Sequence, residues 1–192
     1  MTQSSRRGFL IGTACGLGSA YSALRWPAIR NAEAYAKQAA ESAAAPAFEF
    51  FSSEQAAEVE GIAAQIIPSD GTAGARDARV LYFIDRALVS FDRDKQAAYT
   101  HGLKDLQAKV GAGFPPKHHF ADLNSEEQIR LLTAIEHSEF FELVRLHTIM
   151  GFLARPEYGG NQDDAGWKLI GFGDEMVYEP PFGYYDAEQN EH

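Results

Sequence analysis

Hydrophobic residues recur at intervals of three and four through most of the chain between residues 52 and 155, which is the spacing of one face of an α-helix. The first stretch begins at Ser52, which has Gln55 three residues on as in a capping box, and it ends at Pro68. A second stretch of the same kind covers residues 80–91. The pattern therefore predicts two helices joined by a turn rich in Ser, Asp and Gly.

Three more helices are expected further along. One runs from about Asp92 to Val110 and is ended by glycines and by Pro115-Pro116. The next is capped by Asn124 or Ser125, and its apolar positions are Ile129, Leu132 and Ile135. After a break at residues 136–138, the last contains Phe141, Val144, Leu146, Ile149 and Phe152 and stops before Pro156. No segment shows the sustained alternation of a strand, so we predict an all-α fold, a single compact domain of about five helices.

The helical pattern ends at about residue 156. Glycines, aromatic residues and acids follow, which favours an irregular, extended C-terminal arm that packs on the helices or on a partner. Large apolar side chains outside the helical pattern need burial, and Trp and Tyr are common anchors at protein interfaces. The candidate partner interface therefore comprises Tyr158, Trp167, Ile170, Phe172, Tyr178, Tyr184 and Tyr185.

The N-terminus has the parts of a twin-arginine export signal. Arg6 and Arg7 are followed by Phe9 and Leu10, and an apolar stretch reaches residue 24. Small-residue sites at 32–36 favour cleavage near Ala36, while a retained N-terminal anchor is the alternative. We therefore expect a signal peptide over 1–36, an Ala-rich linker over 37–46, and the helical domain with its arm over 47–192. Export by this route predicts a periplasmic protein, and the translocase itself is an expected partner.

Charge and cysteine content narrow the functional classes. The net charge is −10, and residues 1–46 carry five basic and two acidic residues, which leaves −13 on the remainder. An acidic body disfavours nucleic acid and anionic lipid as partners. The one cysteine, Cys15, lies in the signal, so the domain is expected to have no disulfide, thiolate metal site or CxxCH haem attachment.

The domain also lacks the usual starting points of catalysis and cofactor binding. GxGxxG, Walker and GxSxG patterns are absent, and no Glu-x-x-His pair typical of di-iron bundles occurs at Glu136 or Glu142. His118-His119 lies in a proline-bounded loop and is interpreted as solvated or locally hydrogen-bonded. Oxygen ligands at Asn161, Asp163 and Asp164 lack the spacing of a calcium loop. We expect no catalytic, cofactor-binding or metal residue in this chain.

Two alternatives from other classes remain open at this point. His147 lies on an apolar helix, where a core histidine is the favoured interpretation. A stand-alone periplasmic enzyme would instead use His147 and Glu142, with Asp163 or Asp164, as its acid and base groups. A periplasmic sugar-binding protein would stack Trp167, Tyr178, Tyr184 and Tyr185 on sugar rings.

Four segments resemble the gluconate 2-dehydrogenase subunit 3 family. They are YFIDRAL at 82–88, FFELVRLHT at 140–148, PEYGGN at 156–161 and GWKLIGF at 166–172, of which the last is the most specific. The resemblance covers nearly the whole domain and includes the twin-arginine leader.

The resemblance implies a small accessory subunit. In that family the small subunit accompanies an FAD-dependent oxidoreductase of the glucose-methanol-choline type and, commonly, a c-type cytochrome, which together oxidise sugars or sugar acids in the periplasm. FAD is then expected in the partner subunit, and haem c in the cytochrome. A flavoprotein must fold around FAD in the cytoplasm, so joint export with a signal-bearing subunit is physically reasonable.

Overall fold

The computed structural model describes residues 47–174, and within this range the chain forms six α-helices and no strand. This confirms the predicted all-α fold. The signal peptide over 1–36, the linker over 37–46 and the end of the arm lie outside the described residues. The helices are α2 (Ser53–Ile66), α3 (Val80–Val89), α4 (Gln96–Gly113), α5 (Ser125–Ile135), α6 (Glu139–Leu153) and α7 (Ala165–Ile170). Short 3-10 turns occur at Arg93–Lys95, Phe120–Asp122, Pro156–Tyr158 and Gln162–Asp164.

Three helices begin at capping residues, and the sequence indicates two of them, Ser52 and Asn124. Ser52 and Asn124 each form a complete capping box, with Gln55 and Glu127 respectively. Ser138 accepts a hydrogen bond from the backbone N–H of Phe141 at the start of α6. Each cap satisfies N–H groups that the first turn of a helix leaves without partners, so these starts are fixed locally.

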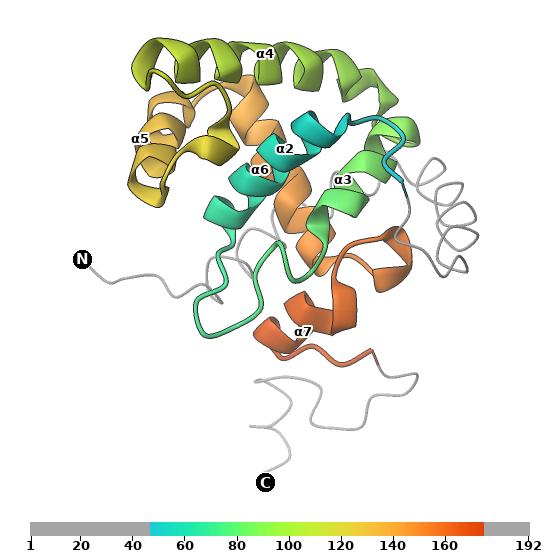
Figure 1. Cartoon of the computed structure of the whole chain (residues 1–192). Helices are drawn as coiled ribbons and strands as arrows, with labels where there is room; N and C mark the ends of the chain where they lie inside the picture. The colour runs from blue at the N-terminus through green and yellow to red at the C-terminus, as the bar shows by residue number, and fades with distance from the viewer. Residues whose placement is uncertain (1–46, 175–192) are drawn as a thin grey trace, which may run out of the picture.

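Helix α6 is the central element of the domain, and α2, α3, α4 and α7 all pack against it (Figure 1). Its sequence is apolar on most sides, as expected for a helix surrounded by others. The interior is built from the predicted apolar faces, including Val59 and Ile62 of α2, Ile84 and Leu88 of α3, and Val144 of α6, all fully buried. Helix α4 runs along one side of the bundle (Figure 1). Its residues Tyr99, Leu103, Leu106 and Val110 are buried.

The third predicted helix differs from the observed one at both ends. A 3-10 turn occupies Arg93–Lys95, and α4 begins only at Gln96 and continues through the glycines to Gly113. The chain turns here because the N–H of Asp92 donates to the carbonyl of Ala87, and the carbonyl of Asp92 accepts from the N–H of Lys95. The side chain of Asp92 is thereby directed into the interior, where it is fully buried.

The entry to α2 is tied to α3 by a buried carboxylate. Asp85 accepts hydrogen bonds from the backbone N–H groups of Glu49, Phe50 and Phe51 at 2.8–3.0 Å. Phe48 stacks on Tyr82 with ring centroids 5.1 Å apart. Among the described residues, Phe48 is therefore packed against α3 already at the start of the range.

The described part of the C-terminal arm is folded back on its own domain, whereas the sequence predicts an extended segment. Two 3-10 turns and α7 follow α6, and α7 packs against α6 (Figure 1). Asn161, fully buried, donates to the carbonyl of Ala154 and accepts from the N–H of Gly166. Contact with α6 requires glycine: a Cβ on Gly166 would lie 1.8 Å from the carbonyl oxygen of Phe152, and one on Gly160 would lie 2.1 Å from that of Gly151. The spacing of hydrophobic residues does not predict such contacts between separate segments, so the sequence pattern did not indicate that the arm folds back.

Candidate functional site

The predicted interface residues within the described range gather on α7 and the turns beside it. We define the arm patch as Tyr158, Trp167, Ile170 and Phe172. Trp167 donates its indole N–H to the carbonyl of Leu153 at 2.8 Å, and its ring meets Phe172 edge to face, with centroids 5.2 Å apart. Tyr158, Trp167 and Ile170 are half-buried against their own domain, while Phe172 remains 46% exposed. The patch is therefore anchored by Trp167, and it leaves Phe172 partly exposed.

The other sequence-predicted site residues belong to the two ends of the chain. Arg6, Arg7, Phe9 and Leu10 of the export signal, and Tyr178, Tyr184 and Tyr185 of the arm, lie outside the described residues. Of the aromatic residues expected to stack on sugar rings, Trp167 is the one within the described range. Its indole N–H points inward to the α6 backbone.

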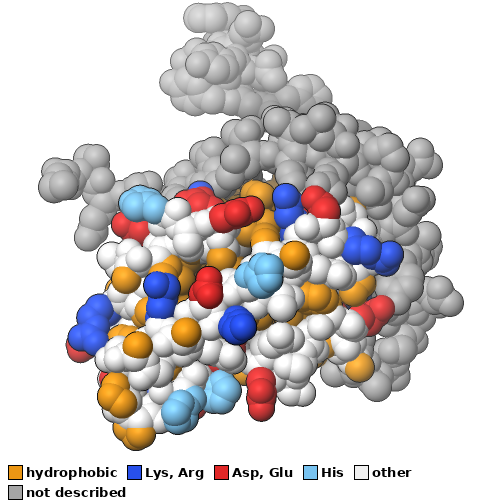
Figure 2. Space-filling view, turned by 90° about the horizontal axis from the view of Figure 1, so that it is seen from above, with side chains coloured by type: hydrophobic (Ala, Val, Ile, Leu, Met, Phe, Trp, Pro, Cys, Tyr) orange, Lys and Arg blue, Asp and Glu red, His pale blue; other side chains and the backbone are white. Residues whose placement is uncertain are grey.

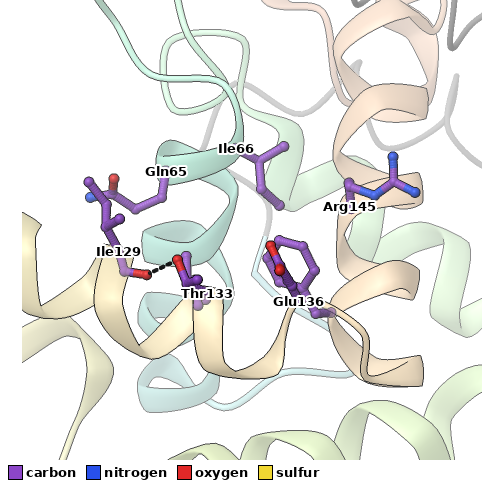
Figure 3. A pocket seen from close by; sticks show the side chains of 8 residues that line it. Gln65, Ile66, Ile129, Thr133, Glu136 and Arg145 are labelled. Carbon is purple, nitrogen blue, oxygen red and sulfur yellow. Dashed lines mark hydrogen bonds between the residues drawn. The ribbon is translucent and has the colours of Figure 1, made fainter.

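A second surface feature, which sequence reasoning missed, is an open groove of about 270 Å³ between α2, α5 and α6 (Figure 3). Its apolar lining comes from Ile66 of α2, from Ile129 and Leu132 of α5, and from Phe141 of α6. Ile129 is 53% exposed, although its spacing with Leu132 predicts a core position. The spacing identifies an apolar face but does not say whether another helix covers all of it.

The polar groups around this groove are already engaged with neighbours. Gln65 donates to Gln128 at 2.6 Å, the hydroxyl of Thr133 donates to the carbonyl of Ile129 at 2.9 Å (Figure 3), and Arg145 pairs with Glu142. A polar small molecule would have to break these bonds to be oriented in the groove. The groove therefore suits apolar side chains better than a sugar.

His147 is buried at the meeting point of three segments. Its Nε2 lies 3.1 Å from Oδ2 of Asp92, and its Nδ1 lies 3.0 Å from the hydroxyl of Tyr99. All three residues are fully buried. The structure does not bring His147 together with Glu142, which pairs with Arg145 at the surface, or with Asp163 and Asp164, which lie in the arm. The acid and base groups of the stand-alone enzyme alternative therefore do not share a site.

The histidine loop is attached to α2 through a buried glutamate. Glu58 accepts a hydrogen bond from the N–H of Phe120 at 2.8 Å and lies 3.1 Å from Nδ1 of His119. His119 is thus hydrogen-bonded to a partner 61 residues away in the sequence, whereas the sequence predicts a solvated or locally hydrogen-bonded histidine pair. Burial raises the pKa of Glu58, and the hydrogen bonds from Phe120 and His119 offset part of that increase.

Because the pKa of Glu58 is higher in the folded chain than in the unfolded chain, its contribution to stability is fullest below the unfolded value and is lost as the pH rises through the folded value. The free energy of unfolding of the wild type, relative to Glu58→Gln, is therefore expected to rise as the pH falls from 8 to 4.5. Urea titrations followed by circular dichroism would measure this difference. His119→Gln in both backgrounds removes the neighbouring imidazole as a control, and a difference independent of pH would contradict the prediction.

The oxygen groups considered for calcium are used within the arm. The amide oxygen of Asn161 accepts from Gly166, and a carboxylate oxygen of Asp163 accepts from Gln162. Across residues 47–174 there is no group of three or more His, Cys, Asp or Glu side chains arranged to hold a metal ion. Nor does any helix in this range combine the length and apolar character needed to cross a membrane.

Charges of both signs are mixed on the visible surface. Figure 2, seen from above the view of Figure 1, shows Lys and Arg interspersed with Asp, Glu and His and with small hydrophobic patches. Among the described residues, charged side chains also form pairs, including Arg76 with Glu60 and Lys117 with Glu127. The face lacks a field of one sign that would favour a polyanionic partner.

Comparison with protein families gives one match, to gluconate 2-dehydrogenase subunit 3, over residues 53–174. The chain belongs to this family. The matched range begins with α2 and ends with the last described residue, so it includes every described helix, the groove and the arm patch. Searches of curated proteins and of solved structures found no match. The family is that of a dehydrogenase subunit, so the relevant chemistry of the described surfaces is contact with other subunits of a dehydrogenase complex.

Proposed function

We propose that this chain is the non-catalytic small subunit of a flavin-dependent sugar or sugar-acid dehydrogenase complex. In this proposal it supplies the twin-arginine signal for joint export to the periplasm, and it stabilises or matures the flavoprotein subunit. The observation that carries the proposal is the family match over residues 53–174. The partner would be a flavoprotein of the glucose-methanol-choline type that holds FAD, with a c-type cytochrome as a further subunit.

Two features of the chain support a non-catalytic role for it beside a catalytic flavoprotein. The leader with Arg6-Arg7 is typical of proteins exported in the folded state, which is the state a flavoprotein reaches after binding FAD in the cytoplasm. His147, Glu142 and Asp163 each have different partners, so the acid and base groups that a stand-alone enzyme would need do not form one site. Electron transfer and substrate oxidation would then belong to the partner subunits.

The arm patch is the surface we assign to the flavoprotein. Phe172 is exposed but rests on Trp167, so a partner can bury it against a platform that is already ordered. An aromatic anchor that needs no rearrangement costs little conformational entropy on binding. Asp174, which ends the described range, pairs with Arg155 at 3.2 Å.

Phe172→Asp is expected to reduce capture of the flavoprotein by at least about 30-fold, since loss of a buried aromatic anchor typically costs about 2 kcal/mol and a buried charge adds to that cost. The measurement is co-purification of the tagged chain from cells that produce both subunits, with bound flavin read by absorbance. Ile129→Asp is the matched control, because Ile129 is also a large, similarly exposed hydrophobic residue but lies in the groove. If Ile129→Asp lowers capture and Phe172→Asp does not, the groove is the docking surface. Flavin or sugar oxidation in the purified chain alone would contradict the proposed function itself.

A further inference from the structure

Arg86, in the last turn of α3, is a half-buried cation whose guanidinium has no hydrogen bond or ion pair with any of residues 47–174. The other half-buried basic residues of this range are each paired with a carboxylate: Lys95 with Asp94, Lys117 with Glu127 and Arg145 with Glu142. Arg79, Lys104 and Lys109 have no such partner in this range either, but they are exposed to water. Arg86 therefore differs from the other basic side chains in being partly desolvated without a counter-charge.

Gly159, in the turn that begins the arm, makes room for this guanidinium. A Cβ on Gly159 would lie 2.6 Å from Nη1 of Arg86 and 3.1 Å from its Cζ. The φ of Gly159 is +100°, in the left-handed region that glycine adopts without strain. Tyr158 of the arm patch is the preceding residue, so the guanidinium lies against the arm backbone at the border of that patch.

The carboxylates closest in sequence to Arg86 and Gly159 do not neutralise the guanidinium. Asp85 is buried and accepts from the backbone N–H groups of residues 49–51. Glu157 is exposed, and it forms no ion pair within the described part of the chain. Partial burial of a cation without an anion costs free energy, and an anion supplied from outside the domain would offset that cost.

The chemistry of this position favours a carboxylate on a protein. A guanidinium is always charged, and its planar fork of N–H donors matches the two oxygens of a carboxylate. The chain as a whole is acidic, with a net charge of −10, so a polyanion such as nucleic acid or an anionic lipid surface would be repelled by the rest of the molecule. A single acidic side chain that approaches Arg86 meets this repulsion least.

We propose that Arg86 receives an Asp or Glu side chain of the flavoprotein, with two guanidinium N–H groups donating to the two carboxylate oxygens. The inference rests on the proposed function, because it takes the flavoprotein as the partner. The docking surface then extends from the arm patch across Gly159 to α3. Phe172 supplies the apolar contact, and Arg86 fixes the orientation of the partner through a directional ion pair.

Arg86→Gln is expected to reduce capture of the flavoprotein by about 10- to 100-fold, since the hydrogen bonds of the carboxylate to the charged group are lost. Co-purification of the tagged full chain from cells that produce both subunits would measure this loss. The melting temperature of the purified variant should stay within about 3 °C of the wild type, because the side chain has no bond to lose in the described domain. Arg130→Gln is the matched control: Arg130 is also an arginine, but it lies on α5 over the ring of Phe114.

The outcomes separate this inference from the proposed function. If the wild type captures no flavoprotein, the proposed function is contradicted. If the wild type captures it and Arg86→Gln captures it equally well, the assignment of Arg86 alone is overturned. A large fall in the melting temperature of Arg86→Gln would show instead that Arg86 stabilises the carboxyl end of α3, and this too would overturn the assignment.

Arg86→Lys gives a direct test of the carboxylate, because a carbodiimide joins an amine to a carboxylate in contact with it and leaves a guanidinium unjoined. Lysine keeps the positive charge, so the complex should still form. We expect treatment of the co-purified complex to link position 86 to an Asp or Glu of the flavoprotein, as identified by mass spectrometry of the joined peptides. Arg130→Lys should give no link between the subunits at position 130. An intact Arg86→Lys complex with no link at position 86, or with a link to Glu157 of the same chain, would overturn the proposal.

Discussion

Replacing Arg6 and Arg7 by lysine is expected to leave both this chain and the proposed flavoprotein partner in the cytoplasm. Lysine keeps the positive charge but lacks the planar guanidinium, so loss of export would show that the pair is recognised by its geometry. The expected effect is nearly complete loss of both proteins from the periplasmic fraction. Immunoblots of cell fractions, with dehydrogenase activity in each fraction, would measure it.

Arg25→Lys with Arg30→Lys is the matched control, because it makes the same chemical change within the leader and outside the motif. Both proteins should then reach the periplasm as in the wild type. A flavoprotein that is exported normally beside a retained small subunit would contradict joint export. A small subunit that is itself exported despite the double lysine change would contradict the twin-arginine interpretation of the leader.

Gly166→Ala is expected to have the largest effect on the folded domain. The added Cβ would lie 1.8 Å from the carbonyl oxygen of Phe152, and this atom belongs to the α6 backbone and cannot rotate away. Helix α7 must therefore shift, which disrupts the hydrogen bonds from Trp167 to Leu153 and from Gly166 to Asn161. The overpacking and the loss of these buried hydrogen bonds together are expected to lower the free energy of unfolding by about 2–4 kcal/mol. For a domain of this size, that lowers the melting temperature by about 7–15 °C.

Gly111→Ala is the matched control for this substitution. Gly111 lies in α4, and its Cβ would meet no atom within 4 Å, so alanine should stabilise the helix by up to about 1 kcal/mol. Thermal unfolding followed by circular dichroism compares the two variants. An unchanged melting temperature for Gly166→Ala would show that the arm does not pack on α6 as described. If the arm patch docks the flavoprotein, Gly166→Ala should also lower flavoprotein capture, because Phe172 loses its platform.

The helices of this protein are determined largely by local sequence. Ser52, Asn124 and Ser138 satisfy N–H groups within three residues of themselves, and the apolar spacing selects the buried face of each following helix. These interactions involve residues close together in the chain, so they can be predicted from the amino-acid sequence. The same local information, together with four short segments, was enough to identify the family.

The tertiary structure decided which residues meet and which remain exposed. His147 finds Asp92 and Tyr99 at separations of 55 and 48 residues, and the helical spacing that placed His147 on an apolar face says nothing about either partner. Ile129 has the same spacing as a core residue but lies on the rim of a groove, because no described helix covers it fully. The arm folds back because Gly160 and Gly166 permit backbone contact with α6. Periodicity reports the faces of a helix, whereas pairing between faces depends on shapes that exist only after the chain has folded.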